Sequence, residues 1–267
     1  MDDQTQRPTG FVEALAKGIA ILEAFDAMHS EMTLSEVARR VAISPAAARR
    51  GLITLIELGY VGQRGTRFYL KPKVMALGSC FYFATRIDEI ILPDLRALVE
   101  TFGDASSVGT LNDRNVIYVA HYSQQRARRA SAVVGASYPA FATSIGRVLL
   151  AGMSDAELAS WLAALDPVPL TARTITDKTE LYTEIMRVRE QGFATTVDQL
   201  DYGITAIAVP IINEAGKTVA ALNSSGYSGM LSPQELVAER LTELRAVAKS
   251  IAQQINRFPT LRAVLGD

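Results

Sequence analysis

The stretch "SPAAARRGLITLIELGYV", residues 44–61, constrains the fold most, because it contains both a start and a stop signal for a single helix. Ser44 suits the N-cap position and Pro45 the first helical position, while Gly59 suits the left-handed residue that follows a helix end. Together these signals predict a helix over residues 45–58.

The predicted helix has two different faces. At about 100° per residue, Ala48, Gly51, Leu52, Leu55 and Leu58 fall on one side, and Pro45, Ala46, Arg49, Arg50, Ile53 and Glu57 fall on the other. We expect the first side to join a core and the second to face outward. The small residues at the start of the outer face would let the helix backbone approach a grooved partner closely.

Two further helices are predicted upstream. In "TLSEVARRVAIS", residues 33–44, Thr33 and Glu36 have the spacing of a capping box, and apolar residues recur at helical intervals. A short helix therefore precedes a tight turn into the helix that begins at Pro45. The segment "EALAKGIAILEAFDAM", residues 13–28, predicts another helix. Its expected apolar stripe consists of Leu15, Ile19, Leu22 and Phe25.

Downstream, "YVGQRGTRFYL", residues 60–70, is typical of a β-hairpin with its tip at residues 62–66. Three helices with a tight turn between the second and the third, followed by a hairpin, predict a winged helix-turn-helix over residues 11–72, after a flexible tail of residues 1–10. In such a motif the second helix of the turn enters the major groove of DNA, and its first residues reach base edges. The expected base contacts are Pro45, Ala46, Arg49 and Arg50.

The distribution of charge supports a DNA-binding function. The whole chain has a formal net charge of −1, but residues 39–73 contain eight arginines and lysines and a single acidic residue, Glu57. A guanidinium group can bond a guanine edge or pair with a phosphate. The expected phosphate contacts are Arg39, Arg40, Arg64, Arg67, Lys71 and Lys73. The alternative for this segment is a helical bundle with incidental surface arginines.

Composition limits the other classes of function. A chain of 267 residues, 49% hydrophobic and 21% charged, predicts two globular domains. The polar start "MDDQTQRPTG" and the lack of an apolar run of about 18 residues predict a cytoplasmic protein without an export signal or a membrane span. The single cysteine, Cys80, excludes an internal disulfide. There are two histidines, of which His121 is interpreted as a strand-end residue, so we expect no enzyme, no metal site and no cofactor.

The second half of the chain has a mixed pattern. Residues 73–90 predict a linker helix, and residues 91–267 predict a domain in which β-like runs such as "NVIYVAHY" and "ITAIAVPII" alternate with helical segments. A break in the helical pattern is expected near Pro93. The pattern predicts an α+β domain with a central, mostly antiparallel sheet flanked by helices. Such a domain can hold a small ligand above its sheet.

The chain resembles the IclR family of bacterial transcription regulators over nearly its whole length. The matching stretches, in order, include "LAKGIAILEAF", "MTLSEVARR", "SPAAARRGLITLIELGYV", "ATSIGRVLLAGMSDAEL", "REQGFATTVDQLDYGITAIAVPI" and "GKTVAALNSS". The runs "AAARR" and "YPAFATSIGRVLLAG" are most similar to the branch that controls protocatechuate and 4-hydroxybenzoate genes of the β-ketoadipate route.

This resemblance implies a fold, an assembly and a ligand. The second domain would be a GAF-like effector-binding domain, and a homodimer or homotetramer would bind a partly palindromic operator in double-stranded DNA. The effector would be a small hydroxylated carboxylic acid such as protocatechuate or 4-hydroxybenzoate. Carried over by position, its contacts would be Tyr138, Ala140, Thr143, Ser144, Thr196, Ile204, Ala206, Asn223 and Ser225.

Several alternatives remain open at the level of the sequence. The hydroxyl and amide groups of this set suit carboxylate and hydroxyl oxygens, but residues 223–225 could also end a strand and form turn bonds. Arg126, Arg128 and Arg129 could serve an anionic effector, the assembly or solvation alone. The competing functions are a regulator with a non-aromatic small-acid effector and a metabolite-binding protein that has lost its DNA target. Members of the branch act as activators or as repressors.

Overall fold

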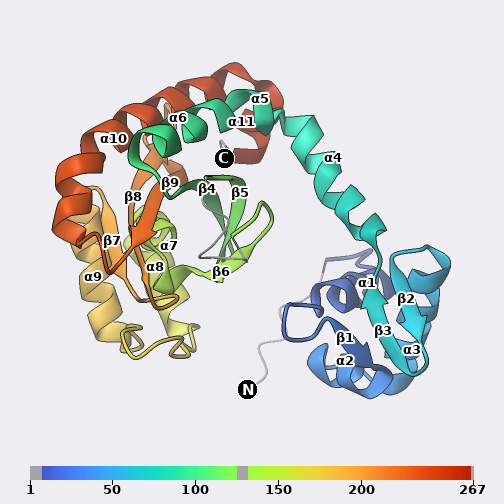
Figure 1. The fold of residues 1–267 in the computed structure, drawn as a ribbon. Helices are drawn as coiled ribbons and strands as arrows, with labels where there is room; N and C mark the ends of the chain where they lie inside the picture. Colours follow the sequence, from blue (N-terminus) through green and yellow to red (C-terminus); the bar gives the residue numbers. More distant parts are fainter. Residues whose placement is uncertain (1–7, 125–131, 266–267) are drawn as a thin grey trace. The chain divides into compact units, whose positions relative to one another are not determined.

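The computed structural model describes residues 8–124 and 132–265. The chain divides into two compact units, residues 1–81 and 82–267, and the division falls within helix α4 (Met75–Thr85). Figure 1 shows a smaller unit with helices and a hairpin, and a larger unit built on a sheet. Because the division falls inside a helix, the domain bounds expected at residues 72 and 90 stay a prediction.

Three helices and a three-stranded sheet form the first unit. The helices are α1 (Glu13–Glu23), α2 (Leu34–Arg40) and α3 (Pro45–Glu57), and the strands are β1 (Glu31–Thr33), β2 (Val61–Arg64) and β3 (Arg67–Leu70). The strands pair antiparallel in the order β1-β3-β2, and a 3₁₀ helix, η1 (Pro72–Val74), follows the sheet. This arrangement confirms the predicted winged helix-turn-helix.

The predicted caps determine where α2 and α3 begin. The Thr33 hydroxyl accepts a hydrogen bond from the N–H of Glu36, and the Thr33 N–H donates to Glu36 Oε2 at 2.7 Å, which completes the capping box. The Ser44 hydroxyl caps α3 by accepting from the N–H of Ala47 at 3.3 Å. A cap of this kind stabilises a helix by about 1 kcal/mol. Both predicted helix starts are therefore confirmed.

The core of the first unit lies between its three helices. α1 packs closely on α3 because residue 51 is a glycine, and a Cβ atom there would lie 2.5 Å from Ile21 Cδ1. The buried core residues are Ile21, Ala24, Met32, Val37, Ala38, Ala48, Leu52, Leu55 and Val61.

The apolar stripe expected on α1 is partly wrong. Leu15 and Ile19 are 63% and 48% exposed, whereas Ile21, which lies outside the stripe, is fully buried. Apolar residues occur on several sides of α1, and the contact with Gly51 of α3 decides which side is buried. Leu58, expected in the core, is half exposed because it lies at the C-cap, beyond the last turn of α3.

The predicted hairpin forms, but its tip is shorter than expected. Arg64 pairs with Arg67 at the end of the ladder, so the turn consists of Gly65 and Thr66. Gly65 has a φ of +57°, a conformation that glycine adopts without strain. The expected tip at residues 62–66 is too long because the first strand continues to Arg64.

A six-stranded antiparallel sheet forms the centre of the second unit. Its strands are β4 (Ala105–Asn112), β5 (Asn115–Ser123), β6 (Ser137–Pro139), β7 (Ala194–Val197), β8 (Ile204–Ile212) and β9 (Thr218–Tyr227). They lie in the order β6-β5-β4-β9-β8-β7, so β4 and β9, far apart in the sequence, are neighbours at the centre.

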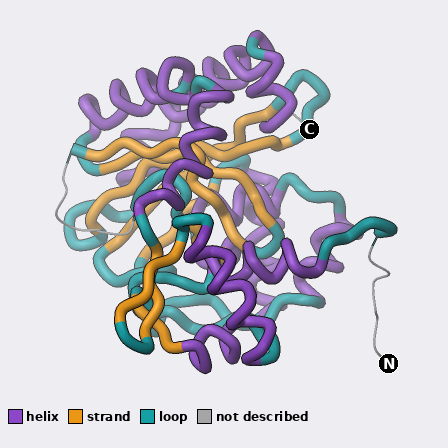
Figure 2. Tube along the Cα trace, turned by 90° about the vertical axis from the view of Figure 1, so that its right-hand side faces the viewer, coloured by secondary structure: helices purple, strands orange, loops and turns teal. Residues whose placement is uncertain are grey.

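Helices cover both faces of this sheet, which confirms the predicted α+β fold. One face carries α6 (Leu92–Phe102) and the long α10 (Pro233–Arg257), with α5 (Ile87–Ile90) and α11 (Pro259–Leu265) beside them. The other face carries the 3₁₀ helix η2 (Ala140–Ala142), α7 (Ser144–Ala151), α8 (Asp155–Ala163) and α9 (Lys178–Gln191). Figure 2 shows the layer that contains α10 along the top of the sheet.

The helix expected over residues 73–90 is interrupted. α4 ends at Thr85, and Arg86 has a φ of +54° before the separate α5 begins. Pro93, where the sequence predicts a break, lies in the first turn of α6. A proline is tolerated there because the first N–H groups of a helix have no partner inside it.

We expect Ile21→Ala to lower the free energy of unfolding of the first unit by about 2–4 kcal/mol, because it leaves a cavity between α1 and α3. The matched control Ile53→Ala removes the same atoms from a side chain that is 57% exposed. It should change the free energy of unfolding by less than about 0.5 kcal/mol. Urea denaturation of the full-length protein measures both values, and equal effects would contradict the assignment of Ile21 to the core.

Candidate functional site

The outer face of α3 presents two arginines to solvent. Pro45, Ala46, Arg49 and Arg50 are all exposed, while Ala48 on the opposite side is buried. Neither guanidinium group forms a hydrogen bond or an ion pair within residues 8–124 and 132–265. Both groups can therefore bind an external partner without first breaking an internal contact.

The two arginines at the end of α2 differ in their contacts. Arg40 forms an ion pair with Asp26, whereas Arg39 has no such partner in the described part of the chain. Asp26 also lies 2.9 Å from His29 Nδ1, and the hydrogen bond from His29, together with Arg40, lowers the pKa of the Asp26 carboxyl. Arg40 is thus held against the loop that follows α1.

The arginines of the wing are also unequal. Arg64 is 79% exposed, and its nearest carboxylate oxygen, Glu31 Oε1, is 3.8 Å away. Arg67 donates a hydrogen bond to the backbone oxygen of Glu31 at 3.2 Å and lies 3.8 Å from the carboxylate of Glu36. Arg67 therefore fastens the wing to β1 and α2, while the more exposed Arg64 lies over the ring of Tyr69, with its Cζ atom 5.8 Å from the ring centroid.

The two lysines after the wing differ in the same way. Lys73 Nζ donates to the backbone oxygen of Leu58 at 2.7 Å, where a cation complements the end of α3. Lys71 is exposed and has no partner among the described residues. The cations most available to DNA are therefore Arg39, Arg49, Arg50, Arg64 and Lys71.

Two rows of short side chains cross the sheet of the second unit. Ala194 and Ala208 belong to the core cluster that contains α7, so both rows face α7, since alternate residues of a strand share a face. Short side chains are the kind that can admit a small ligand above a sheet. Across β5, β4, β9, β8 and β7, the first row consists of His121, Ser107, Asn223, Ala208 and Ala194, and the second of Ser123, Ala105, Ser225, Ala206 and Thr196.

Hydrogen bonds fix the polar half of the first row. Ser107 Oγ and His121 Nδ1 lie 2.9 Å apart, and the N–H of Ser107 donates to Asn223 Oδ1 at 2.9 Å. With Oδ1 as the acceptor in this bond, the Nδ2 group of Asn223 is directed elsewhere as a donor. The ring of His121 lies beside that of Tyr118, with the ring centroids 6.4 Å apart.

The N-terminus of α7 lies above this polar region. Ile145 packs over Gly109, where a Cβ atom would lie 3.1 Å from Ile145 Cγ2, and Gly152 lies beside Thr218. Gly109 pairs with Ala221 of β9, three residues beyond Thr218. The segment of α7 from Ile145 to Gly152 therefore runs along β9 from Ala221 back to Thr218. Seven residues of a helix and three residues of a strand both span about 10 Å, so the two segments match in length. Extended beyond its N-terminal end, the axis of α7 therefore points to Asn223.

This helix start has the properties of an anion site. Thr143 caps α7 by accepting a hydrogen bond from the N–H of Gly146 at 3.0 Å, and Thr143 and Ser144 are both buried. Gly146 permits close packing on η2, because a Cβ atom there would lie 2.0 Å from the backbone oxygen of Ala140. The first N–H groups and the helix dipole place partial positive charge at this end, which binds carboxylates.

The structure brings most of the predicted effector residues together. Tyr138 lies to one side, on β6, where its ring contacts that of Tyr118 edge-on at a centroid distance of 5.0 Å. Ala140 lies in η2 against the start of α7. Five predicted effector residues lie in the rows or beside them on β8: Thr196, Ile204, Ala206, Asn223 and Ser225. Two more, Thr143 and Ser144, lie at the start of α7.

Sequence reasoning missed Ser107 and His121. The signal that could have found Ser107 is the stretch "ASSVGTL", in which Ala105, Ser107 and Gly109 place a small residue at every second position of a strand. His121 carries no comparable local signal, because its partner is on the neighbouring strand. Arg126, Arg128 and Arg129 lie outside the described residues.

A buried arginine fixes α7 to the loop after β7. Arg147 is 2% exposed; its Nε donates to the backbone oxygen of Phe141 at 3.1 Å, and Nη2 donates to Gln199 Oε1 at 2.8 Å. Nη1 lies 3.6 Å from Glu184 of α9. Burial lowers the pKa of Arg147 to about 10, so the group stays charged at neutral pH.

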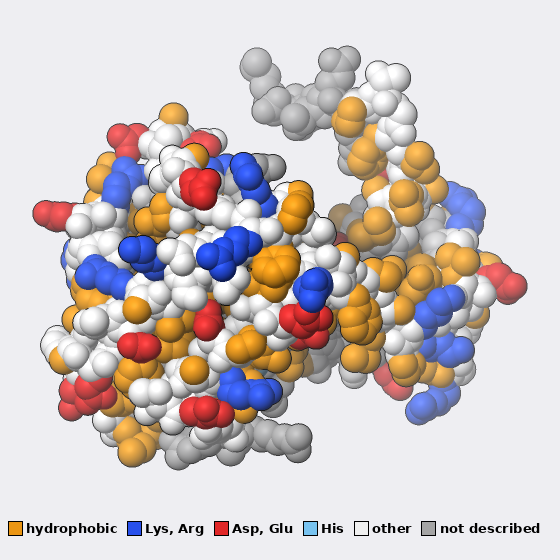
Figure 3. Space-filling model, turned by 90° about the horizontal axis from the view of Figure 1, so that it is seen from above, with side chains coloured by type: hydrophobic (Ala, Val, Ile, Leu, Met, Phe, Trp, Pro, Cys, Tyr) orange, Lys and Arg blue, Asp and Glu red, His pale blue; other side chains and the backbone are white. Residues whose placement is uncertain are grey.

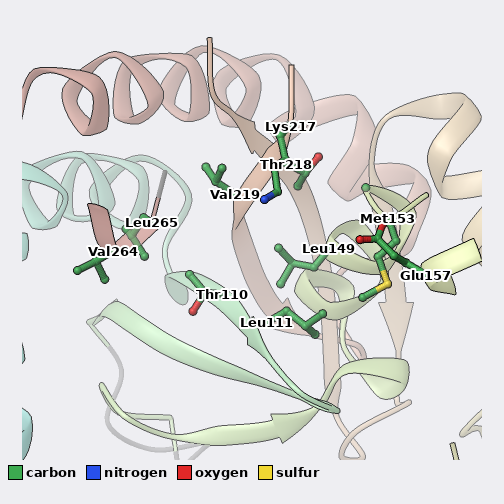
Figure 4. Close-up of a pocket in the computed structure, with 11 residues that line it drawn as sticks. Thr110, Leu111, Leu149, Met153, Glu157, Lys217, Thr218, Val219, Val264 and Leu265 are labelled. Atoms are coloured by element: carbon green, nitrogen blue, oxygen red, sulfur yellow. The ribbon is translucent and has the colours of Figure 1, made fainter. Parts of the chain in front are cut away.

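A separate cavity of about 340 Å³ lies at the other end of β9. It opens near Thr218, at the start of the strand, whereas Asn223 and Ser225 lie toward its end, so none of the predicted effector residues lines it. Figure 4 shows its walls, which come from β4, α7, the segment after α7, α8, β9 with the turn before it, and α11. The lining residues are Thr110, Leu111, Leu149, Gly152, Met153, Glu157, Lys217, Thr218, Val219, Val264 and Leu265.

Within residues 8–124 and 132–265, no group of three or more His, Cys, Asp or Glu side chains is placed to hold a metal ion. In the same ranges no helix combines the length and the apolar character that a membrane crossing requires.

Family models match both units of the chain. The model of the IclR helix-turn-helix domain matches residues 14–65, and that of the bacterial transcriptional regulator IclR C-terminal domain matches residues 83–253. The chain belongs to the IclR family of transcriptional regulators. The IclR helix-turn-helix match contains α3 and its exposed arginines, and the C-terminal match contains both rows of the sheet and α7.

Relatives cover most of this IclR-family chain. It is 34% identical to the Pca regulon regulatory protein of Pseudomonas putida over 92% of this chain and 84% of that protein. It is 32% identical to the p-hydroxybenzoate hydroxylase transcriptional activator of Acinetobacter baylyi, over 92% of each. An IclR homolog from Microbacterium hydrocarbonoxydans, solved as a complex with 4-hydroxybenzoate, shares the fold with a TM-score of 0.72 at 22% identity, over 91% of this chain and 99% of that chain.

We expect Arg147→Ala to lower the free energy of unfolding of the second unit by about 3 kcal/mol, because it leaves buried acceptors without a donor. The matched control is Arg187→Ala, since Arg187 is half exposed and pairs with the same Glu184 at 2.7 Å. This control should cost less than about 1 kcal/mol. Urea denaturation measures both, and an equal loss from Arg187→Ala would contradict a special role for the buried group.

Proposed function

We propose that this IclR-family regulator binds its operator through the outer face of α3 and the wing, and that a small aromatic hydroxy acid controls this binding from a site between α7 and the two rows. The observation that carries the ligand assignment is the position of a helix N-terminus above short polar side chains. An aromatic ring can lie over the alanines of the rows while its carboxylate faces α7.

Arg49 and Arg50 support the assignment of α3 to the major groove. They project from the first half of the helix next to Pro45 and Ala46, whose small side chains permit a close approach to bases. An arginine at such a position can bind the O6 and N7 atoms of guanine together. The remaining available cations, Arg39, Arg64 and Lys71, would contact phosphates on either side.

The relatives support an aromatic effector. Two of them are described as regulators of Pca and p-hydroxybenzoate genes, and a homolog of the same fold is solved with 4-hydroxybenzoate. In this chain the Nδ2 group of Asn223 and the hydroxyl of Ser144 could donate to a carboxylate, while Thr196 and Ser225 offer further hydroxyls. Protocatechuate and 4-hydroxybenzoate are therefore the acids we propose, with a non-aromatic small acid as the alternative.

An exposed apolar face on the first unit supports assembly with a second copy of the chain. Phe11 and Val12 are 45% and 59% exposed, and Leu15 and Ile19 continue this face along α1. Apolar side chains gathered in this way mark an interaction surface. A dimer would place its two α3 helices about 34 Å apart on a partly palindromic operator. Two such dimers would form the tetramer.

Replacing Arg49 and Arg50 together by alanine is expected to weaken operator binding by about tenfold or more, because base and phosphate contacts are lost. The melting temperature should stay the same, since both side chains are exposed and have no partner in the described part of the chain. The control Arg173→Ala/Arg187→Ala removes the same charge from exposed side chains of the second unit. Fluorescence anisotropy on DNA from upstream of the protein's own gene, at two salt concentrations, measures the affinities. An unchanged affinity of the α3 variant would exclude α3 as the recognition helix.

We expect 4-hydroxybenzoate or protocatechuate to shift operator affinity in the same anisotropy titration. Each ligand changes affinity only as far as it binds the DNA-competent and DNA-incompetent states differently. An operator affinity that changes with neither acid would leave the assignment as a DNA-binding regulator in place and exclude the aromatic effector. Ligand-dependent thermal stabilisation without specific DNA binding would instead favour a metabolite-binding protein that has lost its target.

A further inference from the structure

We propose that Ser107 and His121 together recognise the ring hydroxyl group of the effector, while its carboxylate faces the start of α7. This inference rests on the proposed function, because it names the part of that site that distinguishes a hydroxylated ring from an unsubstituted one. Three observations carry it: the position of the pair in the first row, the hydrogen bond within it and the burial of Ser107.

The pair is fixed before any ligand arrives. Ser107 is 3% exposed; its N–H is bonded to Asn223 Oδ1, and its Oγ lies 2.9 Å from His121 Nδ1. A serine hydroxyl has one donor and two acceptor sites. Whichever group supplies the hydrogen between Oγ and Nδ1, the oxygen keeps at least one acceptor site. A phenolic O–H is the complementary donor.

The spacing of the site fits a ring with groups at its two ends. The first turn of α7 lies over Gly109 of β4, two residues from Ser107, and His121 pairs with Ser107 on the neighbouring strand β5. Two residues of a strand span about 7 Å, so the pair lies about this far along the strands from the contact with α7. A 4-hydroxybenzoate ion measures about 6 Å from its carboxyl carbon to its hydroxyl oxygen, and a hydrogen bond adds about 2.8 Å at each end.

The two ends of the site differ in electrostatic character, which fixes the orientation of the ligand. The start of α7 carries partial positive charge and suits a carboxylate. With its hydrogen directed at His121 Nδ1, the Ser107 oxygen offers acceptor sites only, which suit an O–H and repel a carboxylate. Beside these two positions, Ala105, Ala206 and Ala208 provide an apolar floor for the ring. Benzoate would fill the floor and the carboxylate position but would leave an acceptor site of the buried Ser107 oxygen without a donor, at a cost in affinity.

The test compares 4-hydroxybenzoate with benzoate by isothermal titration calorimetry on the full-length protein. Wild type should bind 4-hydroxybenzoate about tenfold or more tightly than benzoate, because a site built for a hydroxyl group rejects the analogue that lacks it. Ser107→Ala and His121→Phe should each remove this preference, while the affinity for benzoate stays within about threefold of wild type. Thr110→Val, on the same strand but in the wall of the separate cavity, is the control and should keep the preference.

The outcomes separate this inference from the proposed function. If wild type prefers 4-hydroxybenzoate and the preference survives in Ser107→Ala and His121→Phe, another group reads the hydroxyl and the inference is overturned. An equal loss of affinity for both acids overturns it as well, since the pair would then only maintain the shape of the site. Equal affinities of the wild type for both acids would also overturn the inference, because the site would then not distinguish a hydroxylated ring. If wild type binds neither acid, the proposed aromatic function fails first, and the assignment of the pair fails with it.

Discussion

The register of β4 against β9 is the constraint on which the rest of the second unit depends. Ser107 faces Asn223 although 116 positions separate them in the sequence. A slip of one residue in an antiparallel pair turns every side chain to the other face of the sheet. The residues that β4 and β5 contribute to both rows would then point to α10, while those of β7, β8 and β9 still faced α7. Two bonds oppose this slip: the N–H of Ser107 donates to Asn223 Oδ1, and Ser106 Oγ donates to the Asn223 backbone oxygen at 2.5 Å.

The site also requires that α7 be held in place along the sheet, because the charge at a helix start acts only over its first turn. Three contacts hold it. Gly146 lets the start of the helix pack on η2, Gly152 lets its end lie beside β9, and Arg147 binds the loop that contains Gln199. None of these groups needs to touch the effector. Together they decide where a carboxylate can meet both the helix start and Asn223.

Elements with local signals could be predicted from the sequence, and contacts between distant elements could not. The caps at Thr33 and Ser44 are bonds to residues three positions away, so α2 and α3 begin where expected. The buried side of α1 depends on Gly51, a residue of another helix. The position of His121 depends on a β-bulge: simple alternation would place Tyr118 and His121 on opposite faces. Because the register shifts between Val108 and Gly109, Tyr118 pairs with Gly109 and His121 with Ser107, and both rings face α7. A bulge of this kind leaves no mark in hydrophobic periodicity.

The same distinction applies to charge in the first unit. Residues 39–73 hold eight cations and one acidic residue, but carboxylates from outside or beside this segment reach several of them, as Asp26 reaches Arg40 and Glu36 reaches Arg67. Figure 3 shows acidic side chains beside several of the Lys and Arg side chains on the face drawn. Among the described residues, the cations without partners include Arg49 and Arg50, on the helix that would read bases. A unit with little general basicity has weak non-specific attraction to DNA. If α3 docks on DNA as proposed, that docking would supply much of the affinity, which would couple the strength of binding to recognition of the right sequence.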